Sequence, residues 1–483
     1  MAKRQLKPIS NELIIDRLKF ENPWWIKGTI DEDYNKMQRR LYFNLFYPLV
    51  KQTDVKRAVV LMGPRRVGKT VLMHHTIEEL LRSGYNHHSI CYIGIDNPIY
   101  LNLSLEQLFK LAREATGNPD PKNWFVFFDE IQYLKNWEVH LKVLVDSYPH
   151  TRFIVTGSAA AALRFKSLES GAGRFTEFML PPLTFHEYIH LKGFDHLIRP
   201  VSMKWIGKEY TFHSSINIKE INSHFIDYIN FGGYPEVIFS SHIQSNPGRY
   251  IKSDIIDKVL LRDLPSLYGI QDVQELNSFF TTLAYYSGNE VSLETLSQSS
   301  GVDKNLLKKY LDYLEAAFLI KVVHRIDDTA RKFQRATFYK IYLTNPSLRS
   351  ALFSPITATD ESFGSMVETA IYAQWMHREW FTPWYASWKL GRSHGEVDMV
   401  GLDEKKLKPS WALEIKWTNR YFDNPGQLKS LLHFCEKNML KSAIVTSIDK
   451  EGVINHNGLD LIFFPASMYA YTVGVNTIEQ KRD

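Results

Sequence analysis

The chain has 483 residues, too many for one ordinary hydrophobic core, so we expect roughly two to four domains. Its hydrophobic share of 44% and aromatic share of 13% exclude a disordered chain, and its net charge of +5 allows a polyanionic partner without requiring one. The two cysteines are isolated, no uncharged apolar run reaches about 18 residues, and the N-terminus mixes charged with apolar residues. We therefore expect a soluble, cytoplasmic protein without a signal peptide, a zinc site or a membrane span.

Residues 1–50 form a lead-in, in which the apolar residues from Tyr34 to Val50 have roughly helical spacing. From Ala58 to Pro182, apolar strands alternate with segments long enough for crossover helices, which predicts a parallel α/β sheet. The predicted strands are AVVLM, SICYIGI, NWFVFFDE and TRFIVTGS. We assign residues 51–183 to this first domain.

The first strand leads into a phosphate-binding loop. The segment LMGPRRVGKT fits the pattern GxxxxGK[ST], and an amphipathic helix follows it. Backbone N–H groups of such a loop surround phosphate oxygens, the lysine reaches the terminal phosphates, and the last hydroxyl binds Mg²⁺. The residues predicted to bind nucleotide are Gly63, Pro64, Arg65, Arg66, Val67, Gly68, Lys69 and Thr70, with Thr70 also a magnesium ligand. The sequence thus predicts ATP and Mg²⁺ as cofactors.

The later strands of this domain supply further candidate residues. The strand NWFVFFDE places Asp129 to hold the magnesium shell and Glu130 to polarise the attacking water. Ser158, just beyond RFIVTGS, is placed to sense the terminal phosphate, although an ordinary strand-ending serine fits as well. Arg174, in GAGRF, is placed to reach the phosphate of a neighbouring subunit in a homo-oligomer, or else is a solvated loop arginine.

Five segments in this order resemble the AAA-class ATPases of the prokaryotic and archaeal type: GPRRVGKT, FFDE, VTGSAAAAL, SGAGRF and LPPLTFHEY. The resemblance covers roughly Tyr34 to Ile270, including the segment FGGYP. It implies an AAA-like ATPase core followed, as in many family members, by a winged helix and a restriction-endonuclease-like domain.

The next two regions have different patterns. Residues 184–272 are mostly helical in pattern, apart from a polar interruption at 205–217, and we expect a helical subdomain. Residues 273–350 give a short helix, a Ser-Gly turn, a longer helix and two strands. This is the order of elements in a winged helix-turn-helix.

The longer helix of this predicted module carries Lys304, Lys308 and Lys309 opposite its apolar face. These lysines are candidates for binding nucleic acid. Further basic residues make the module locally basic, namely Arg325, Arg331, Lys332, Arg335 and Lys340. The alternative is a solvated face on a domain that serves only as a spacer.

Residues 351–470 return to an α/β pattern and contain a candidate acidic site. Side chains two apart share one face of a strand, so Glu414 and Lys416 of PSWALEIKW point the same way. Asp398 of HGEVDMVGL lies beside them if the two strands pair as a hairpin. Two carboxylates and a lysine suit phosphodiester hydrolysis, with Asp398 and Glu414 as Mg²⁺ ligands and Lys416 orienting the water.

With Glu368 on the preceding helix, these residues resemble the PD-(D/E)xK nuclease core, which has its acids on a helix and two neighbouring strands. The resemblance implies catalytic roles for Glu368, Asp398, Glu414 and Lys416. The Gln-xxx-Tyr helix motif of some nuclease branches is missing, since Gln427 is paired with Leu431, which leaves the substrate branch open. A structural aspartate and a Glu–Lys pair on an amphipathic strand are the alternative.

We therefore expect an α/β multidomain protein with a P-loop sheet, a helical subdomain, a winged helix and a nuclease-like domain. Its expected function is ATP binding and hydrolysis coupled to Mg²⁺-dependent cleavage of nucleic acid, with DNA favoured over RNA. Two alternatives stay open: an ATP-switched DNA-binding regulator, and a scaffold ATPase with a protein partner. Salt-dependent DNA binding would separate the last of these from the others.

Overall fold

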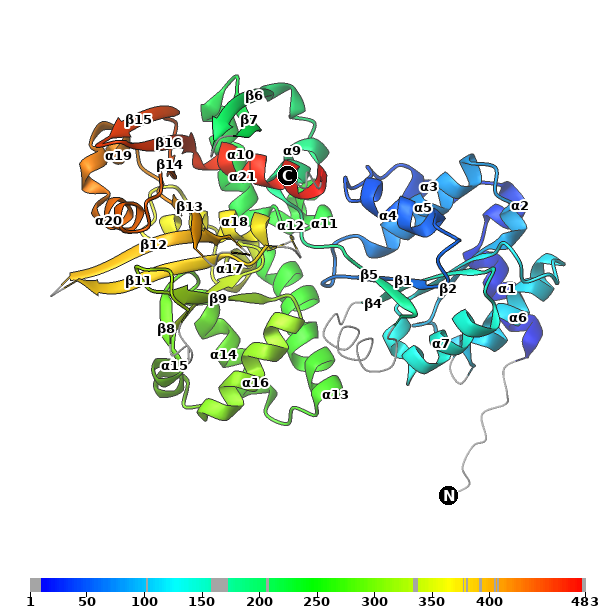
Figure 1. Ribbon diagram of the computed structural model, residues 1–483. Helices are drawn as coiled ribbons and strands as arrows, with labels where there is room; N and C mark the ends of the chain where they lie inside the picture. The colour runs from blue at the N-terminus through cyan, green and yellow to red at the C-terminus, as the bar shows by residue number, and fades with distance from the viewer. Residues whose placement is uncertain are drawn as a thin grey trace. The chain divides into compact units, whose positions relative to one another are not determined.

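The computed structural model describes residues 10–100, 103–157, 173–205, 208–332, 338–376, 378, 381–390, 393–403, 405 and 408–479 (Figure 1). The chain divides into two compact units, Met1–Pro181 and Pro182–Asp483. The predicted boundary after residue 183 lies beside this division. Within the part of the chain that the structure describes, no helix is both long and apolar enough to cross a membrane.

The first unit is built on a five-stranded, all-parallel sheet (Figure 1). Its strands are β1 (Ala58–Met62), β2 (Ile90–Gly94), β3 (Phe125–Asp129), β4 (Arg152–Gly157) and β5 (Phe175–Met179), in the order β2-β3-β4-β1-β5. The helices between β1 and β4 are α5 (Lys69–Arg82), α6 (Leu105–Thr116) and α7 (Trp137–Ser147), with 3₁₀ turns η1 (His87–Ser89), η2 (Pro98–Tyr100) and η3 (Ile131–Tyr133). The central strands are buried along their whole length, as in parallel sheets covered on both faces. The predicted parallel α/β sheet is confirmed.

The strand order determines where the functional groups meet. Strand β4 lies between β1 and β3, and parallel strands place all their carboxyl ends at one edge of the sheet. The loop after β1, Asp129 at the end of β3 and Thr156 near the end of β4 therefore meet at this edge. Open α/β sheets bind their ligands outside the carboxyl ends of the strands.

The lead-in is part of this first unit and covers the outer edge of β2. Its helices are α1 (Asn11–Glu21), α2 (Trp24–Lys27), α3 (Glu32–Asn35) and α4 (Phe43–Lys51). The side-chain amide of Asn22 accepts from the Tyr92 N–H at 2.6 Å and donates to the Tyr92 carbonyl at 2.8 Å. The indoles of Trp24 and Trp25 both donate to the Ile90 carbonyl, at 2.9 and 2.7 Å. These side chains satisfy backbone groups that an uncovered edge strand would leave available to other chains.

The second unit begins with helices interrupted by a β-hairpin. The helical elements are α9 (Phe185–Leu191), η4 (Asp195–Leu197), α10 (Ile218–Phe231), α11 (Pro235–Phe239), α12 (Ser241–Gln244), the π-helical η5 (Gly248–Asp257) and η6 (Val259–Asp263), and α13 (Leu264–Tyr268). The expected helical pattern is wrong at β6 (Ile198–Trp205), which pairs in antiparallel fashion with β7 (Lys208–Ser215), a strand within the segment expected as a polar interruption. Tyr210 and Phe212 are the apolar residues of β7 and lie on one face of it, and Phe212 stacks on Phe464 with ring centroids 4.6 Å apart. Packing against a distant segment thus stabilises this hairpin. The polar residues around it are the reason that the sequence pattern did not predict its strands.

A mixed nine-stranded sheet organises the rest of the second unit (Figure 1). In spatial order its strands are β15 (Gly452–His456), β16 (Leu459–Pro465), β14 (Ser442–Ser447), β13 (Pro409–Glu414), β12 (Ser393–Leu402), β11 (Trp384–Leu390), β9 (Ile320–Ile326), β10 (Phe338–Leu343) and β8 (Glu290–Ser292). The helices are α14 (Val273–Tyr285), α15 (Leu293–Ser300), α16 (Lys304–Ala316), α17 (Ser347–Leu352), α18 (Phe363–Trp375), α19 (Arg420–Asp423), η7 (Pro425–Gln427), α20 (Lys429–Lys437) and α21 (Ala466–Glu479). Strand β9 pairs in parallel with β11. The regions expected as residues 273–350 and 351–470 therefore share one sheet.

Two hydrophobic cores pack against this sheet. One contains residues of α18 and α21, and the other contains residues of α20. Successive residues of β13, Ala412 and Leu413, belong to different cores because side chains alternate between the faces of a strand. The first core fixes α18 against the sheet and so positions Glu368.

Candidate functional site

The phosphate loop lies between β1 and α5, at the carboxyl edge of the first unit's sheet. Gly68 is the N-cap of α5 and has a left-handed φ of 92°, which favours glycine. A Cβ atom at Gly63 would collide with the carbonyl oxygen of Leu180. The predicted nucleotide-binding residues are thus gathered where a helix N-terminus favours anions. They are Gly63, Pro64, Arg65, Arg66, Val67, Gly68, Lys69 and Thr70.

The buried ammonium group of Lys69 is held by the loop itself. It donates to the carbonyl oxygens of Gly63 at 3.0 Å and Pro64 at 2.8 Å. A buried charge must be hydrogen-bonded, and phosphate oxygens are stronger acceptors for it than carbonyl oxygens are. The lysine is therefore placed to exchange these partners for a nucleotide phosphate.

Arg40, in the lead-in, anchors the same loop from outside. Its buried guanidinium donates to the carbonyl oxygens of Val67 and Pro181, both at 2.8 Å. These bonds tie the phosphate loop to the end of β5. Sequence reasoning missed Arg40, because no local pattern in the lead-in distinguishes it from a solvated arginine.

The carboxylate of Asp129 is the most densely hydrogen-bonded group at this edge. Its Oδ2 accepts from the hydroxyl groups of Thr70 at 2.7 Å and Tyr92 at 2.8 Å. Its Oδ1 accepts from the Thr156 hydroxyl and from the backbone N–H of Glu130. The predicted pair Thr70 and Asp129 is therefore in direct contact. Tyr92 and Thr156 are contacts that the sequence did not indicate.

Glu130 follows β3 directly and lies beside Asp129. Its φ of 54° is in the left-handed region, an unfavourable conformation for a residue with a Cβ. Its backbone N–H also donates to the Thr156 hydroxyl at 3.1 Å, and its carboxylate accepts from the side-chain amide of Gln132. Strained backbone of this kind is often found at active sites, where the surroundings hold it. Gln132 is a further residue that sequence reasoning missed.

The other two residues predicted for the nucleotide site are Ser158 and Arg174. Ser158 lies outside the residues that the structure describes. Arg174 directly precedes β5 and so lies at the amino edge of the sheet, opposite the phosphate loop. Its guanidinium is paired with Asp146 of α7 at 2.5 Å, and the side chain is 42% exposed. Arg174 thus cannot serve the loop of its own first unit.

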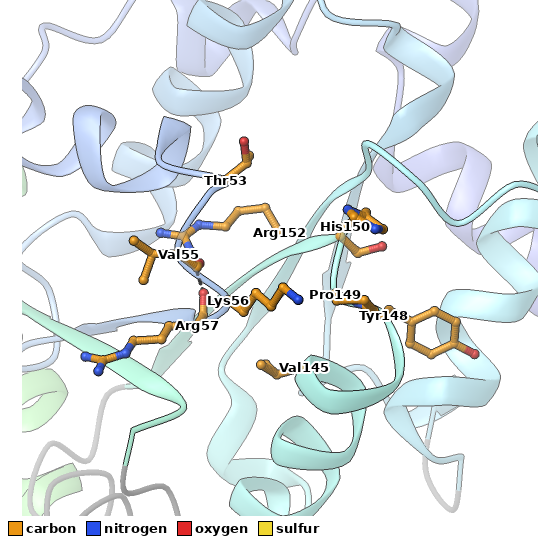
Figure 2. Close-up of a pocket in the computed structure, with 10 residues that line it drawn as sticks. Thr53, Val55, Lys56, Arg57, Val145, Tyr148, Pro149, His150 and Arg152 are labelled. Carbon is orange, nitrogen blue, oxygen red and sulfur yellow. Dashed lines mark hydrogen bonds between the residues drawn. The ribbon is translucent and has the colours of Figure 1, made fainter.

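A basic hollow lies at the same amino edge (Figure 2). Lys56, Arg57, His150 and Arg152 are among the residues that line it. The Arg152 guanidinium donates to the carbonyl oxygens of Arg57 and, at 3.0 Å, of Val55. Burial lowers the pKa of Arg152 to about 10, so it remains charged at neutral pH. Positive side chains therefore gather near Arg174, at the end of the sheet away from the phosphate loop.

In the second unit, three of the four predicted C-terminal residues meet directly. Strands β12 and β13 pair in antiparallel fashion, as expected, which brings Asp398 beside Glu414. The Lys416 ammonium lies 3.0 Å from Asp398 Oδ2 and 2.9 Å from Glu414 Oε1. Asp398 Oδ2 also accepts from the backbone N–H of Ile415 at 2.7 Å. The lysine thus bridges the two carboxylates.

The fourth residue, Glu368 of α18, is joined to this group by Lys340 of β10. The Lys340 ammonium lies 2.9 Å from Glu368, 2.7 Å from Glu396 and 3.9 Å from Asp398. Glu368 also accepts from the Tyr342 hydroxyl at 2.5 Å. Lys340, one of the residues that make the predicted module locally basic, is only 3% exposed and so adds no positive charge to its surface.

Burial and the two lysines act in opposite directions on the acidic cluster, which we define as Glu368, Glu396, Asp398 and Glu414. Burial raises the pKa of Glu414 to about 7, with Asp398 adding to the effect and Lys416 opposing it. Burial also raises the pKa of Glu368. At Asp398, the effect of burial is outweighed by Lys416 and Lys340, and the pKa is lowered.

The cluster has more carboxyl groups than lysine ammonium groups. Four carboxylates share two lysines, so full ionisation leaves two negative charges unbalanced. Oε2 of Glu414 is buried without a hydrogen-bond partner. Among the described residues, however, no group of three or more His, Cys, Asp or Glu is arranged to hold a metal ion. The lysines lie between the acids instead.

The predicted nucleic-acid-binding lysines lie on α16. Lys308 and Lys309 are exposed on this helix, whereas Leu307, Tyr310 and Leu311 are buried. The third predicted lysine is Lys304, and its ammonium group is paired with Glu294 of α15. Of the other basic residues, Arg325 lies 3.7 Å from Glu290, and Arg335 is outside the described residues. The exposed positive charge of α16 is therefore carried by its second turn.

Two family models match parts of the chain. Residues 55–189 match the model of an AAA domain, which contains the phosphate loop, Asp129 and Glu130. Residues 222–360 match a domain of unknown function, DUF8612.

Two uncharacterised proteins are similar along most of the sequence. One, from Methanocaldococcus jannaschii, is 24% identical over 366 residues, which are 75% of this chain and 76% of that protein. The other, from Haemophilus influenzae, is 24% identical over 414 residues, which are 83% of this chain and 92% of that protein. The similarity thus extends well beyond the residues matched by the AAA model.

Two solved structures are similar to this chain at lower sequence identity than these relatives. A Walker-type ATPase of Pyrococcus abyssi has a TM-score of 0.39 at 15% identity and covers 63% of this chain and 94% of its own. The Aeropyrum pernix Orc1 protein, solved in complex with DNA, has a TM-score of 0.32 at 11% identity and covers 68% of this chain and 95% of its own. Residues 55–189 form an AAA-type P-loop ATPase domain, as the family model and the geometry of the loop indicate.

Proposed function

We propose that this protein binds and hydrolyses ATP with Mg²⁺ in its first unit, and that the nucleotide controls an action of the second unit on nucleic acid. The observation that carries the ATPase part is the 2.7 Å hydrogen bond between Thr70 and Asp129. It joins the residue after the loop lysine to the acid at the end of β3. P-loop ATPases use this pair to hold magnesium beside the terminal phosphates.

The residues present fit a magnesium ion. A hydroxyl and a carboxylate are oxygen donors of the kind that Mg²⁺ prefers, and Asp129 is almost fully buried next to the loop. Magnesium would neutralise phosphate charge during hydrolysis. Thr70 and Asp129 would hold it, and Lys69 would bind the terminal phosphates.

Glu130 is our candidate for polarising the attacking water. It follows Asp129 directly, and the amide of Gln132 holds its carboxylate. We further propose that Arg174 acts on the nucleotide of a second copy, because it lies at the amino edge of the sheet together with the basic residues around Arg152. Ser158 stays a candidate for sensing the terminal phosphate.

For the second unit we propose binding of nucleic acid, with DNA favoured over RNA, through α16. The sequence α14, β8, α15, α16, β9 and β10 follows the order of a winged helix-turn-helix. Lys308 and Lys309 are exposed and suit contact with phosphates. Lys304 would have to exchange Glu294 for a phosphate.

The acidic cluster supports a nuclease as the accompanying activity. Asp398 and Glu414 would be metal ligands, Lys416 would orient the water, and Glu368 would complete the site from α18. A divalent ion would lower the pKa of a bound water molecule there. The excess of carboxyl groups over lysines in the cluster and the unpartnered Oε2 of Glu414 favour such an ion.

A second candidate function is an ATP-switched DNA-binding regulator without nuclease activity. The ion pairs of the two lysines favour this function, because Lys340 and Lys416 already lie between the carboxylates of the cluster. In that case Asp398 and Glu414 are structural residues that lock β12 to β13.

One experiment separates these functions. The purified protein is incubated with labelled duplex DNA, single-stranded DNA and RNA, with Mg²⁺ or Mn²⁺, with and without ATP, beside Lys416→Ala and Lys69→Ala. Cleavage that disappears in Lys416→Ala supports the nuclease, and its response to Lys69→Ala shows whether ATP controls it. ATP hydrolysis and DNA binding without cleavage in any reaction support the regulator. Failure to bind any nucleic acid contradicts both.

A further inference from the structure

Tyr92 of β2 donates to the same carboxylate oxygen that receives Thr70. Its hydroxyl lies 2.8 Å from Asp129 Oδ2, and the Thr70 hydroxyl lies 2.7 Å from that atom. Strand β2 is next to β3 in the sheet, which explains why a side chain of β2 reaches the end of β3. Tyr92 therefore touches the proposed magnesium site without belonging to the phosphate-loop motif.

Other aromatic groups hold the Tyr92 ring. His74 of α5 packs against it with ring centroids 4.7 Å apart. His74 is in turn stacked on Tyr34, with centroids 3.8 Å apart and planes 8° from parallel. The Tyr92 hydroxyl donates to the Asp129 carboxylate, which has only acceptor atoms when it is ionised. The tyrosine is thus fixed in place with its hydroxyl directed at the acid.

We propose that Tyr92 is a positioning residue of the ATPase centre, which holds the Asp129 carboxylate in the orientation that receives magnesium. This inference rests on the magnesium–nucleotide site proposed above. If the Thr70 hydroxyl bound a cation in place of Asp129, Asp129 Oδ2 would still accept the hydrogen bond from Tyr92. The other oxygen keeps its bonds from Thr156 and the Glu130 backbone. The carboxylate would then need no rearrangement to bind a metal ion, which is how fixed surroundings strengthen a binding site.

The test is Tyr92→Phe, which removes the hydroxyl and keeps the ring. Tyr100→Phe is the matched control, because the Tyr100 hydroxyl donates at 2.9 Å to another carboxylate of the same unit, that of Glu21. Binding of a fluorescent ADP analogue is measured first in EDTA and then across a magnesium series. Thermal unfolding of each variant is measured in parallel.

We expect the magnesium midpoint to rise about tenfold in Tyr92→Phe, the size of effect given by one hydrogen bond to a charged group. Affinity in EDTA should match the wild type in both variants, and Tyr100→Phe should keep the wild-type midpoint. In an Asp129→Asn background, adding Tyr92→Phe should change the midpoint no further.

Equal midpoints in wild type and Tyr92→Phe would overturn the positioning role and leave the ATP site in place. The same shift in Tyr100→Phe would also overturn it, because the cause would then be a general loosening of the unit. If the wild-type protein showed nucleotide binding with no response to magnesium, the proposed magnesium site would itself be wrong.

Discussion

The hydroxyl of Thr70 donates to the carboxylate of Asp129 over 2.7 Å and so links the first turn of α5 to the end of β3. The two residues are 59 positions apart in the sequence. Neither a helix nor a strand alone could hold them together, so the parallel sheet order is what creates this contact. A site fixed by strands and a helix is held more rigidly than a site built on loops.

Glu130→Gln should abolish ATP hydrolysis and leave ATP binding intact. The substitution keeps the shape and the contact with Gln132 but removes the basic carboxylate. Loss of a group that polarises the attacking water typically costs about 100- to 10,000-fold in rate. Steady-state phosphate release and ATP-analogue binding measure the two effects. Glu106→Gln, on the exposed side of α6, serves as the control and should hydrolyse at the wild-type rate. A Glu130→Gln protein of wild-type rate would remove Glu130 from the mechanism.

The variant Arg174→Ala should not hydrolyse ATP by itself. Mixing it with a second inactive variant should restore part of the ATPase activity. Arg174 lies at the sheet edge opposite its own phosphate loop, so any action on a nucleotide must occur in another copy. In an equal mixture of Arg174→Ala and Lys69→Ala, about a quarter of head-to-tail interfaces would carry one intact lysine and one intact arginine. Partial recovery of ATPase activity on mixing is the expected outcome.

The control for this experiment is Arg82→Ala, which removes another exposed arginine of the same unit that is paired with an acid. It should hydrolyse ATP at the wild-type rate. If Arg174→Ala did the same, Arg174 would be the solvated loop arginine of the alternative interpretation.

Local sequence was sufficient to predict the structure where a motif lies next to a strand or helix with a clear pattern. The segment AVVLM is β1, and the motif after it lies between this strand and α5, with Gly68 as the left-handed N-cap of the helix. The pairing of β12 with β13 was also predictable, since alternation in each strand indicated which residues face Asp398. Short-range periodicity carries this kind of information.

Contacts between distant segments could not be predicted in the same way. Lys340 reads as one more basic residue in a basic stretch, yet the pairing of β9 with β11 brings its strand to the acids of β12. Arg40 and Tyr92 likewise owe their roles to packing rather than to a local pattern. The hairpin at residues 198–215 was missed for the same reason, because its apolar partner is Phe464.

His74→Phe should make stability less dependent on pH in mildly acidic solution. Burial lowers the pKa of His74 from 6.5 to about 4. Between these values the unfolded chain binds a proton that the folded chain does not, so the wild-type protein loses stability as pH falls from about 6.5 to 4. Phenylalanine keeps the stack on Tyr34 and cannot titrate.

The measurement is urea unfolding of the full chain at several pH values between 4 and 7. The wild type should lose up to about 3 kcal/mol more than His74→Phe over this range. His87→Phe replaces an exposed histidine of the same unit and should follow the wild-type curve. Identical curves for wild type and His74→Phe would show that His74 does not remain neutral when buried.

Lys340→Met should destabilise the second unit strongly, whether or not the acidic cluster is catalytic. The ammonium is buried between Glu368 and Glu396, and methionine leaves both acids without it. Breaking a buried ion pair by removing one partner costs about 3–5 kcal/mol. Lys304→Met is the matched control, because its pair with Glu294 is exposed and should cost less than about 1 kcal/mol. Urea unfolding measures both.

A second substitution, Glu368→Gln, should recover part of the loss, since it removes one of the unpaired charges. If Lys340→Met were as stable as Lys304→Met, the lysine would not neutralise the cluster, and the unbalanced charge at Asp398 and Glu414 would need another source of compensation.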